Sequence, residues 1–455
     1  MSGSFLTVAG GNAQSGQVSV QSSLPSDINS LLQSYLTNVA NNIYSGNESY
    51  FYNNVAQNST LSGVGADTAG TYEVITNVNG QGNSVAGSGS YVVGVPSAVT
   101  QLVVQAPGNA TLAGSSNTTF AVFGAESNVT YNVSGGAGSI FAAGGNDAIN
   151  VTGNNTDDTV FSAGNDTVTF NGTSGQDAVN ALGNATTSVY LGGSDVATVT
   201  ASNNAAVSVN FLSNSGSDVD FINNSTQVAT VFASVQTVGS GTLAYSSNAV
   251  TAFGGTAGIF AVGGRGGFNS LNGGTGSSTL VGGGDGDTLM AAGQTNLLFA
   301  GAGDETLLAS GQTNIFEVGF QEPGIGVVTT DGGVISAGGA SNNVFGIGNV
   351  QATTITGSTV QGASNSYLIN GSFTTLGGQV QSVQGASLDI TDFGGNSTIS
   401  LINPTSAGLS VESVAAALGG NGTQILLSDN TIITLSGVSS SQVNVSQNGT
   451  TITFV

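Results

Sequence analysis

The side chains that could do chemistry in this chain are almost all carboxylates. Among 455 residues there are 24 Asp and Glu, a single cation, Arg265, and no His or Cys. The usual general base, the thiol nucleophile and the lysine of a phosphate loop are therefore excluded. A hydrolase built on two carboxylates is an alternative that residue type leaves open. Its candidate pairs, Asp157 with Asp158 and Asp285 with Asp287, lie in turn-rich sequence where a turn role explains them better, so we expect no enzyme.

The segment between residues 253 and 316 has one apolar side chain at every ninth position. Gly-rich turns separate these positions, and Gly permits the positive φ values that tight turns need. We expect each apolar side chain to point inward from a short strand, with two nine-residue units forming one flattened coil. The 18-residue repeat that follows is visible where 293–296 returns as 311–314. The series consists of Phe253, Val262, Leu271, Leu280, Leu289, Leu298, Leu307 and Phe316.

A second array with looser spacing lies upstream, over about 110–210. Asp147 and Asp166 are separated by the same interval as Asp158 and Asp177, one residue longer than the downstream repeat. A slightly longer coil therefore places alternate aspartates above one another. Short β-branched runs without acidic turns continue the pattern over 210–252 and 325–390.

The turns at 282–289 and 300–307 resemble degenerate copies of the nonapeptide GGxGxDxUx of the RTX, or hemolysin-type, calcium-binding repeat family. The resemblance leaves residues 1–100 unmatched. It implies an all-β fold, an elongated parallel β-roll or β-solenoid with a small N-terminal helical and β cap and a C-terminal β-rich segment.

The resemblance also implies calcium as a cofactor. In RTX proteins the Asp of each repeat and turn carbonyls bind Ca²⁺, which prefers about six to eight oxygens. Here one edge of the array carries Asn269, Asp287 and Glu305 at that position, whereas the other carries only Ser and Asn. Turn formation without metal is the alternative at every site. The implied ligands are Asp287 and Glu305 with Asp285 and Asp304 as helpers, and upstream Asp147, Asp158, Asp166 and Asp177.

The two ends differ from the repeats. An apolar stripe predicts a helix over about 26–44 with Ser26 as its N-cap, expected to cap the solenoid core or to dock onto a neighbouring subunit. The stripe contains Ile28, Leu31, Leu32, Tyr35, Leu36, Val39 and Ile43. The C-terminal segment resembles RTX C-termini, which carry an uncleaved type I secretion signal, and the N-terminus lacks a Sec-type signal. We expect five regions: 1–100, 101–252, 253–320, 321–390 and 391–455.

Composition limits the partners. The net charge of −23 makes nucleic acid or an anionic membrane surface an unexpected partner. No apolar run approaches the roughly 18 residues that span a bilayer. Disorder is disfavoured because a chain that buries nothing has no reason for fixed apolar spacing.

These features favour a secreted structural protein of a bacterial cell surface or extracellular matrix. We expect self-association into a surface layer or filament, stabilised by calcium, because charged residues are depleted at the cores of stable interfaces. The alternatives are an adhesin that contacts a cell-surface glycan, a cell or ice, and a secreted hydrolase with RTX repeats.

Overall fold

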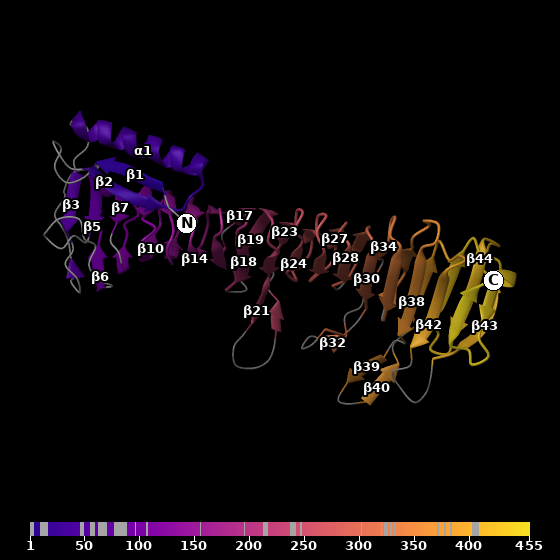
Figure 1. Cartoon of the computed structure of the whole chain (residues 1–455). Helices are drawn as coiled ribbons and strands as arrows, with labels where there is room; N and C mark the ends of the chain where they lie inside the picture. The colour runs from indigo at the N-terminus through magenta and orange to yellow at the C-terminus, as the bar shows by residue number, and fades with distance from the viewer. Residues whose placement is uncertain are drawn as a thin grey trace. The chain divides into compact units, whose positions relative to one another are not determined.

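The computed structural model confirms the expected fold class: the chain is all-β and forms parallel β-solenoid coils (Figure 1). Two compact units are present, Met1–Ala229 (unit 1) and Thr230–Val455 (unit 2), divided within strand β20 (Ala229–Phe232). The structure describes residues 4–9, 17–45, 50–54, 60–61, 71–76, 89–95, 97–105, 108–154, 156–194, 196–212, 217–236, 243–245, 248–301, 303–319, 321–322, 326–327, 330–331, 333–348, 350–370, 373–376, 379–382, 385–402 and 409–455.

In unit 1 each coil gives one strand to each of two parallel sheets. From β7 (Val99–Gln105) onward coils repeat every 18 to 22 residues, as when Thr130 pairs with Ala148 and Val196 with Asp218. Sheet 1 contains β4 (Thr60–Leu61), β6 (Gly89–Gly94), β8 (Gly108–Ala113), β10 (Ser127–Ser134), β12 (Ala148–Gly153), β14 (Asn165–Gly172), β16 (Thr186–Gly193) and β18 (Ala206–Phe211). Sheet 2 contains β3 (Tyr50–Asn54), β5 (Thr71–Thr76), β7 (Val99–Gln105), β9 (Phe120–Phe123), β11 (Ser139–Ala142), β13 (Thr159–Ser162), β15 (Gln176–Ala181), β17 (Val196–Asn203) and β19 (Asp218–Ser225). Parallel pairing thus already begins at β3, upstream of residue 101.

Unit 2 repeats this plan, with coils of 18 or 19 residues up to β30 (Thr313–Val318) and longer coils after it. Its sheet 1 contains β24 (Ile259–Val262), β26 (Ser278–Val281), β28 (Thr295–Phe299), β30 (Thr313–Val318), β35 (Asn342–Ile347), β38 (Ser364–Asn370) and β42 (Ser397–Ile402). Its sheet 2 contains β23 (Val250–Phe253), β25 (Ser270–Asn272), β27 (Thr288–Ala291), β29 (Thr306–Ala309), β34 (Val334–Ser336), β37 (Thr353–Thr356) and β41 (Ser387–Ile390). Short strand pairs interrupt the coils: β21 (Ser234–Gln236) with β22 (Leu243–Tyr245), β31 (Gln321–Glu322) with β32 (Gly326–Val327), β33 (Thr330–Asp331) with β36 (Val350–Gln351), and β39 (Phe373–Leu376) with β40 (Gln379–Ser382).

The nine-residue series is correct over most of its length. From Leu271 to Phe316 every member is buried, and Leu298 pairs with Phe316 as the 18-residue repeat predicts. The first two members, Phe253 and Val262, are one position off the inward row, although Val262 is itself buried. Ala252 pairs with Leu271 and Ala261 with Leu280, so the inward position precedes Phe253 and Val262 by one residue. Phe253 is accordingly 43% exposed, because the turn that follows β24 is one residue longer than its successors.

Helix α1 (Ser26–Tyr44) confirms the predicted span and corrects two details. The Asn29 amide donates to the Pro25 carbonyl, so Pro25 rather than Ser26 is the N-cap. Leu31 is 55% exposed and lies off the buried face.

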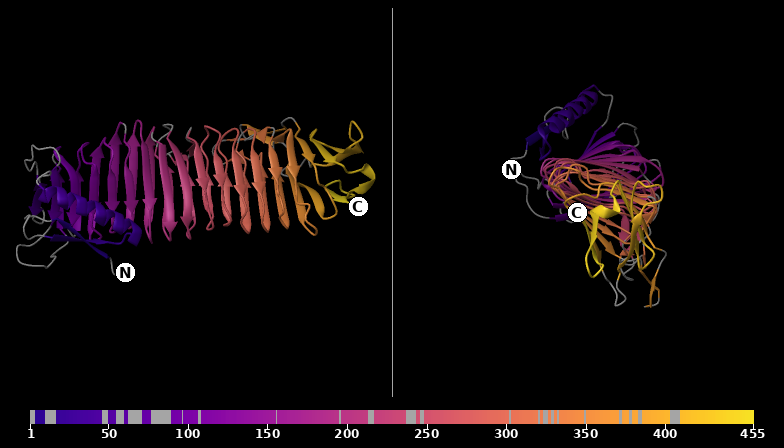
Figure 2. Two further views of the ribbon diagram at one scale, coloured as in Figure 1. Left: turned by 90° about the horizontal axis from the view of Figure 1, so that it is seen from above. Right: turned by 90° about the vertical axis from the view of Figure 1, so that its right-hand side faces the viewer.

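The helix also does not close an end of the solenoid. Figure 2 shows the helix lying alongside the strands of unit 1. Its Leu32, Leu36 and Val39 pack on the outer face of sheet 2 of unit 1, and the Tyr35 ring stacks on Phe120 at 3.9 Å. The antiparallel pair β1 (Ser4–Ala9) and β2 (Gln17–Ser22) precedes it.

The C-terminal strands of unit 2 change direction. β43 (Val411–Ala416), β44 (Gly422–Leu427) and β45 (Ile432–Ser436) form an antiparallel meander, and β45 joins sheet 2 beside β41 in parallel. A short 3-10 helix (Ser440–Gln442) leads to β46 (Val443–Val445) and β47 (Thr451–Phe454), and β47 pairs antiparallel with β42. These strands pair the last parallel strands, whose open edges would otherwise be available to another chain.

Candidate functional site

The predicted site residues lie where strands of the two sheets are joined. We call the junction from sheet 1 to sheet 2 edge 1, and the junction from sheet 2 to sheet 1 edge 2. Six predicted carboxylates point into the solenoid and are buried at these edges: Asp147, Asp158, Asp166, Asp177, Asp287 and Glu305. Asp285 and Asp304 are exposed instead. The register stacks the buried residues in the pairs that their spacing predicts.

Asp147 and Asp166 form a stack at edge 2 of unit 1. Each carboxylate accepts a backbone N–H of the coil before it: Val129 N–H donates to Asp147 Oδ1 at 2.7 Å, and Asp147 N–H to Asp166 Oδ1 at 3.0 Å. The Ser162 hydroxyl donates to Asp166 Oδ2 at 2.7 Å. Burial, and then the charge of Asp166, raises the pKa of Asp147 well above its usual range. Burial raises the pKa of Asp166 to about 6 against its hydrogen bonds.

Asp158 and Asp177 form the matching stack at edge 1 of unit 1. Asp158 N–H donates to Asp177 Oδ1 at 2.9 Å, and the Thr156 hydroxyl donates to Asp177 Oδ2 at 3.1 Å. Burial raises the pKa of Asp158 to about 7, with further contributions from the charges of Asp177 and Asp157. Burial thus disfavours the charged form of Asp147, Asp158 and Asp166 relative to an exposed carboxylate.

Asp287 organises edge 1 of unit 2 as a hydrogen-bond acceptor. Its Oδ1 accepts the backbone N–H and the side-chain amide of Asn269 at 2.7 and 2.8 Å. Its Oδ2 accepts the N–H groups of Gly283 and Gly284 at 2.7 and 3.1 Å. Burial raises its pKa. Glu305 lies one coil further on, and a Cβ on Gly282 would stand 3.1 Å from an oxygen of both acids, so the two carboxylates converge on that glycine.

Edge 2 of unit 2 holds an asparagine ladder that the sequence only partly revealed. Asn296 Nδ2 donates to Asn314 Oδ1 at 2.9 Å, Asn314 to Asn343 at 3.1 Å, and Asn343 to Asn365 at 2.9 Å. All four side chains are buried. The missed signal is Asn-x-aromatic, which recurs at 314, 343 and 365. The aromatic rings stack inside the solenoid, Phe316 on Phe345 at 5.0 Å and Phe345 on Tyr367 at 4.8 Å.

The fit of these sites to calcium differs from place to place. Within the described ranges, no three Asp, Glu, His or Cys side chains gather as a metal site would require. Asp287 already accepts four N–H donors, so its oxygens offer a cation little. Oδ2 of Asp147 and Oδ2 of Asp158 are buried and accept no hydrogen bond. A proton or a cation would be stabilised at these two oxygens, although main-chain carbonyls and water would have to complete the about six to eight ligands of Ca²⁺. At the exposed pair, Asp304 N–H donates to Asp285 Oδ1 at 2.8 Å.

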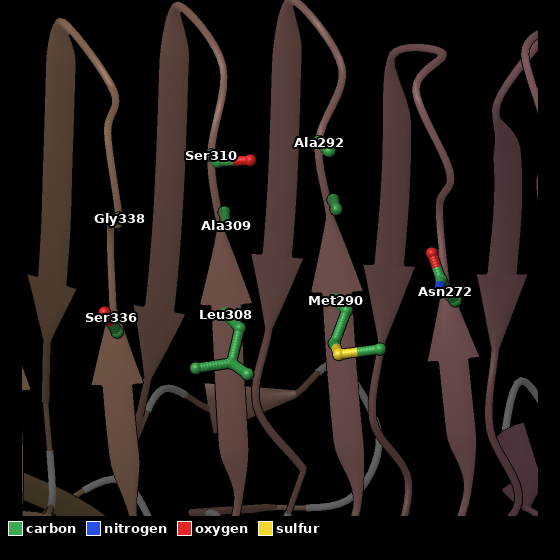
Figure 3. A pocket seen from close by; sticks show the side chains of 9 residues that line it. Asn272, Met290, Ala292, Leu308, Ala309, Ser310, Ser336 and Gly338 are labelled. Atoms are coloured by element: carbon green, nitrogen blue, oxygen red, sulfur yellow. The ribbon is translucent and has the colours of Figure 1, made fainter.

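A shallow groove of about 370 Å³ opens on the outer face of sheet 2 in unit 2 (Figure 3). The Met290 and Leu308 side chains form its walls, and small residues such as Ala292, Ser310 and Gly338 line the strand ends. Its lining contains no ionisable side chain. The groove therefore offers contact area and not acid–base chemistry.

No helix in the described part of the chain has the length and apolar character needed to cross a membrane. Comparison with protein-family models, with curated proteins and with solved structures finds no match to this chain. The β-solenoid is thus established by the strands themselves, and the likeness to RTX repeats rests on the turn motifs.

Proposed function

We propose that this chain is a secreted structural protein that self-assembles into a surface layer or matrix filament. The observation that carries the proposal is the outer face of sheet 1 in unit 2, which we call the apolar face. Its outward side chains form two rows along neighbouring strands. Its apolar side chains are Val281, Leu297, Phe299, Ile315, Val344 and Leu368, and the same rows also contain Thr279 and Ser366 in one row and Glu317 and Gly346 in the other.

The apolar face is unusual for a surface of this kind. A sheet face that meets water is expected to carry polar residues, as sheet 1 of unit 1 does with Thr130, Asn150 and Thr169. Contiguous apolar patches mark interaction sites on soluble proteins. Interface cores are also poor in charge, which agrees with a chain whose residues are only 5% charged. We infer that the partner of this face is a second copy of the chain, because a structural protein that assembles into an array is surrounded by copies of itself.

The test is the assembly state of the purified full chain over a wide concentration range. Sedimentation velocity and electron microscopy should show ordered polymers that dissociate on dilution. The matched variant carries Leu297→Ser and Ile315→Ser on the apolar face, and Thr130→Ser with Thr169→Ser serves as control on unit 1. Monodisperse wild-type monomers at every concentration would sink the proposal.

Calcium is the second part of the proposal. We propose that Asp147 with Asp166, and Asp158 with Asp177, hold Ca²⁺ and so stabilise the folded state; their stacking and the two buried oxygens without a hydrogen bond support this. A ligand at a hundred times its Kd stabilises by about 2.7 kcal/mol. Calorimetric titration of the chelator-treated chain should show binding that is lost in the double variant Asp147→Asn and Asp158→Asn. An unfolding midpoint that is the same with calcium and with chelator would overturn the calcium proposal and leave the self-assembly proposal unaffected.

The location follows as a proposal from the same role. We propose export to a bacterial cell surface or extracellular matrix, directed by the C-terminal segment that resembles an RTX secretion signal. Fusion of residues 391–455 to a reporter in a host with a type I exporter should carry the reporter into the medium. Retention of that reporter in the cells would contradict the proposed secretion signal.

A second candidate is an adhesin that binds a cell-surface glycan. The outer face of sheet 1 in unit 1 favours it, because hydroxyl and amide side chains repeat there in rows, among them Asn132, Asn150 and Thr169. Such groups can hydrogen-bond sugar hydroxyls. Binding of isolated glycans by the full chain, lost on Asn150→Leu with Thr169→Leu, would favour adhesion over assembly.

A further inference from the structure

One turn of unit 2 presents a cation and an aromatic ring to solvent. The turn between β24 and β25 carries Arg265, the single cation of the chain, and Phe268. Arg265 is exposed, and the Phe268 side chain is 81% exposed. Arginine and aromatic residues are enriched at the centres of protein interfaces.

The backbone of this turn holds Phe268 outward at a cost. Phe268 has φ 58, in the left-handed region that non-glycine residues rarely occupy. Its N–H donates to the Asp285 carbonyl at 3.0 Å, which fixes the turn against the next coil. A Cβ on Gly286 would lie 3.1 Å from the Phe268 ring, so that glycine leaves room for it. A strained residue that presents an aromatic ring to solvent points to a role outside the fold of the unit.

The apolar face offers the complementary chemistry. Glu317 is the one charged residue in strands β26, β28, β30, β35 and β38. It pairs with Phe299 on one side and with Gly346 on the other. Its carboxylate lies over Gly346, where a Cβ would collide with it, and burial raises its pKa. A carboxylate held among apolar side chains is the site that an arginine beside an aromatic ring would fit.

The Arg265 turn and Glu317 are unsuited to meet within one copy. In sheet 1 the strand order runs β24, β26, β28, β30, so three strand spacings of about 4.8 Å each, roughly 14 Å in all, separate β24 from β30. Charge complementarity identifies the partner instead. The outer face of sheet 1 of a second copy offers one carboxylate, Glu317, to the one cation of the chain, although the net charge of −23 on each copy opposes contact elsewhere.

We propose that the Arg265 turn of one copy docks on the apolar face of a second copy, with Arg265 paired to Glu317 and Phe268 packed among Leu297, Phe299 and Ile315. This contact rests on the proposed self-assembly and names its interface. Two different surfaces meet, so a pair of copies still has an unused apolar face on one copy and an unused Arg265 turn on the other. Such a head-to-tail contact grows into an open array unless its rotation closes a ring.

Charge exchange tests the contact. We expect Arg265→Glu and Glu317→Arg each to raise the critical concentration for assembly at least tenfold, because either places like charges together. The double variant, which restores the pair and the wild-type net charge, should return to within threefold of wild type. Phe268→Ser should weaken assembly with the charges unchanged. Sedimentation velocity gives the critical concentrations, and urea unfolding verifies that each variant folds.

Controls separate this contact from other causes. Glu412→Arg makes the same charge change as Glu317→Arg at an exposed site of unit 2 and should leave assembly unchanged. If the Arg265→Glu variant has the same critical concentration as wild type, this contact is overturned while the proposed self-assembly is retained. Wild type that never assembles overturns both. A double variant no better than the singles overturns the pairing, and the exposed Arg265 and Phe268 variants decide the matter if Glu317→Arg fails to fold.

Discussion

Both units stack buried polar side chains from coil to coil at edge 2, but they use different side chains to do so. At edge 2, unit 1 stacks the carboxylates Asp147 and Asp166, whereas unit 2 stacks the amides of Asn296, Asn314 and Asn343. An amide donates and accepts, so each rung of the asparagine ladder satisfies the next. An ionised carboxylate only accepts, and the aspartate stack leaves Asp147 Oδ2 buried without a hydrogen bond. The amide ladder is therefore complete in itself, while the carboxylate stack has room for a proton or a cation.

Conversion of one amide rung to a carboxylate is the most damaging change. In Asn314→Asp the donor to Asn343 is lost and an unpaired charge is buried, which should lower the free energy of unfolding of unit 2 by about 3 kcal/mol at neutral pH. Protonation at low pH should recover much of the loss. Urea unfolding measures both. The control Asn342→Asp, at the exposed neighbouring position, should cost little; equal losses from the two variants would show that burial of the rung is unimportant.

The wild-type response to pH should also separate the units. The folded-state pKa values of Asp158 and Asp166, about 7 and 6, and that of Asp147 lie above the ordinary 3.8, so folded unit 1 binds more protons than the unfolded chain. Its stability is complete below about pH 4 and declines as pH rises through about 6 to 7. Urea unfolding at several pH values, read by pulse hydrogen exchange in β12–β15 and in β28–β35, checks this. Unit 2 should change less, through Asp287 and Glu317; a unit 1 that gains stability with rising pH contradicts the prediction.

The reverse conversion, from carboxylate to amide, should stabilise unit 1. Asp158→Asn removes a charge that burial and Asp177 disfavour, and the amide oxygen can still accept the Gly138 N–H, so we expect a gain of about 1–2 kcal/mol at pH 8 that vanishes near pH 5. The adjacent Asp157 is exposed and provides the matched control. Asp157→Asn should change the unfolding free energy by less than about 0.5 kcal/mol. A destabilised Asp158→Asn variant in calcium-free buffer would mean that the carboxylate is needed as such.

The sequence predicts the coils well because one inward side chain per strand is a strict spatial requirement. The series from Leu271 to Phe316 and the stacking of Asp158 on Asp177 both follow from spacing alone. The exceptions have local causes. A turn longer by one residue moves the inward position away from Phe253, and a long helix with one apolar stripe can cover a sheet face as well as an end, as α1 does.

The turn chemistry was less predictable. The resemblance to RTX repeats predicts Asp287 as a calcium ligand, but only the structure shows that four N–H donors already occupy its oxygens. The ladder members Asn343 and Asn365 lie beyond the regular repeat, 29 and 22 residues after their preceding rungs. Insertions between coils hide such partners from a fixed period, although they leave the stacking intact.

Burial, and not the amide pair itself, should set the energetic difference between ladders. Asn150 Nδ2 donates to Asn132 Oδ1 at 2.8 Å on the outer face of unit 1, a bond as short as that between Asn296 and Asn314. Water can replace the lost partner there, so Asn150→Ala should change the unfolding free energy by less than about 0.5 kcal/mol. The same substitution at Asn314 leaves the buried Asn343 Oδ1 without its donor, although Asn296 Nδ2 keeps the Gly293 and Ser310 carbonyls, and should cost about 2 kcal/mol. Urea unfolding of both variants decides it: comparable losses would mean that amide ladders hold the coils together wherever they lie, and that the outer rows of unit 1 serve the fold before any partner.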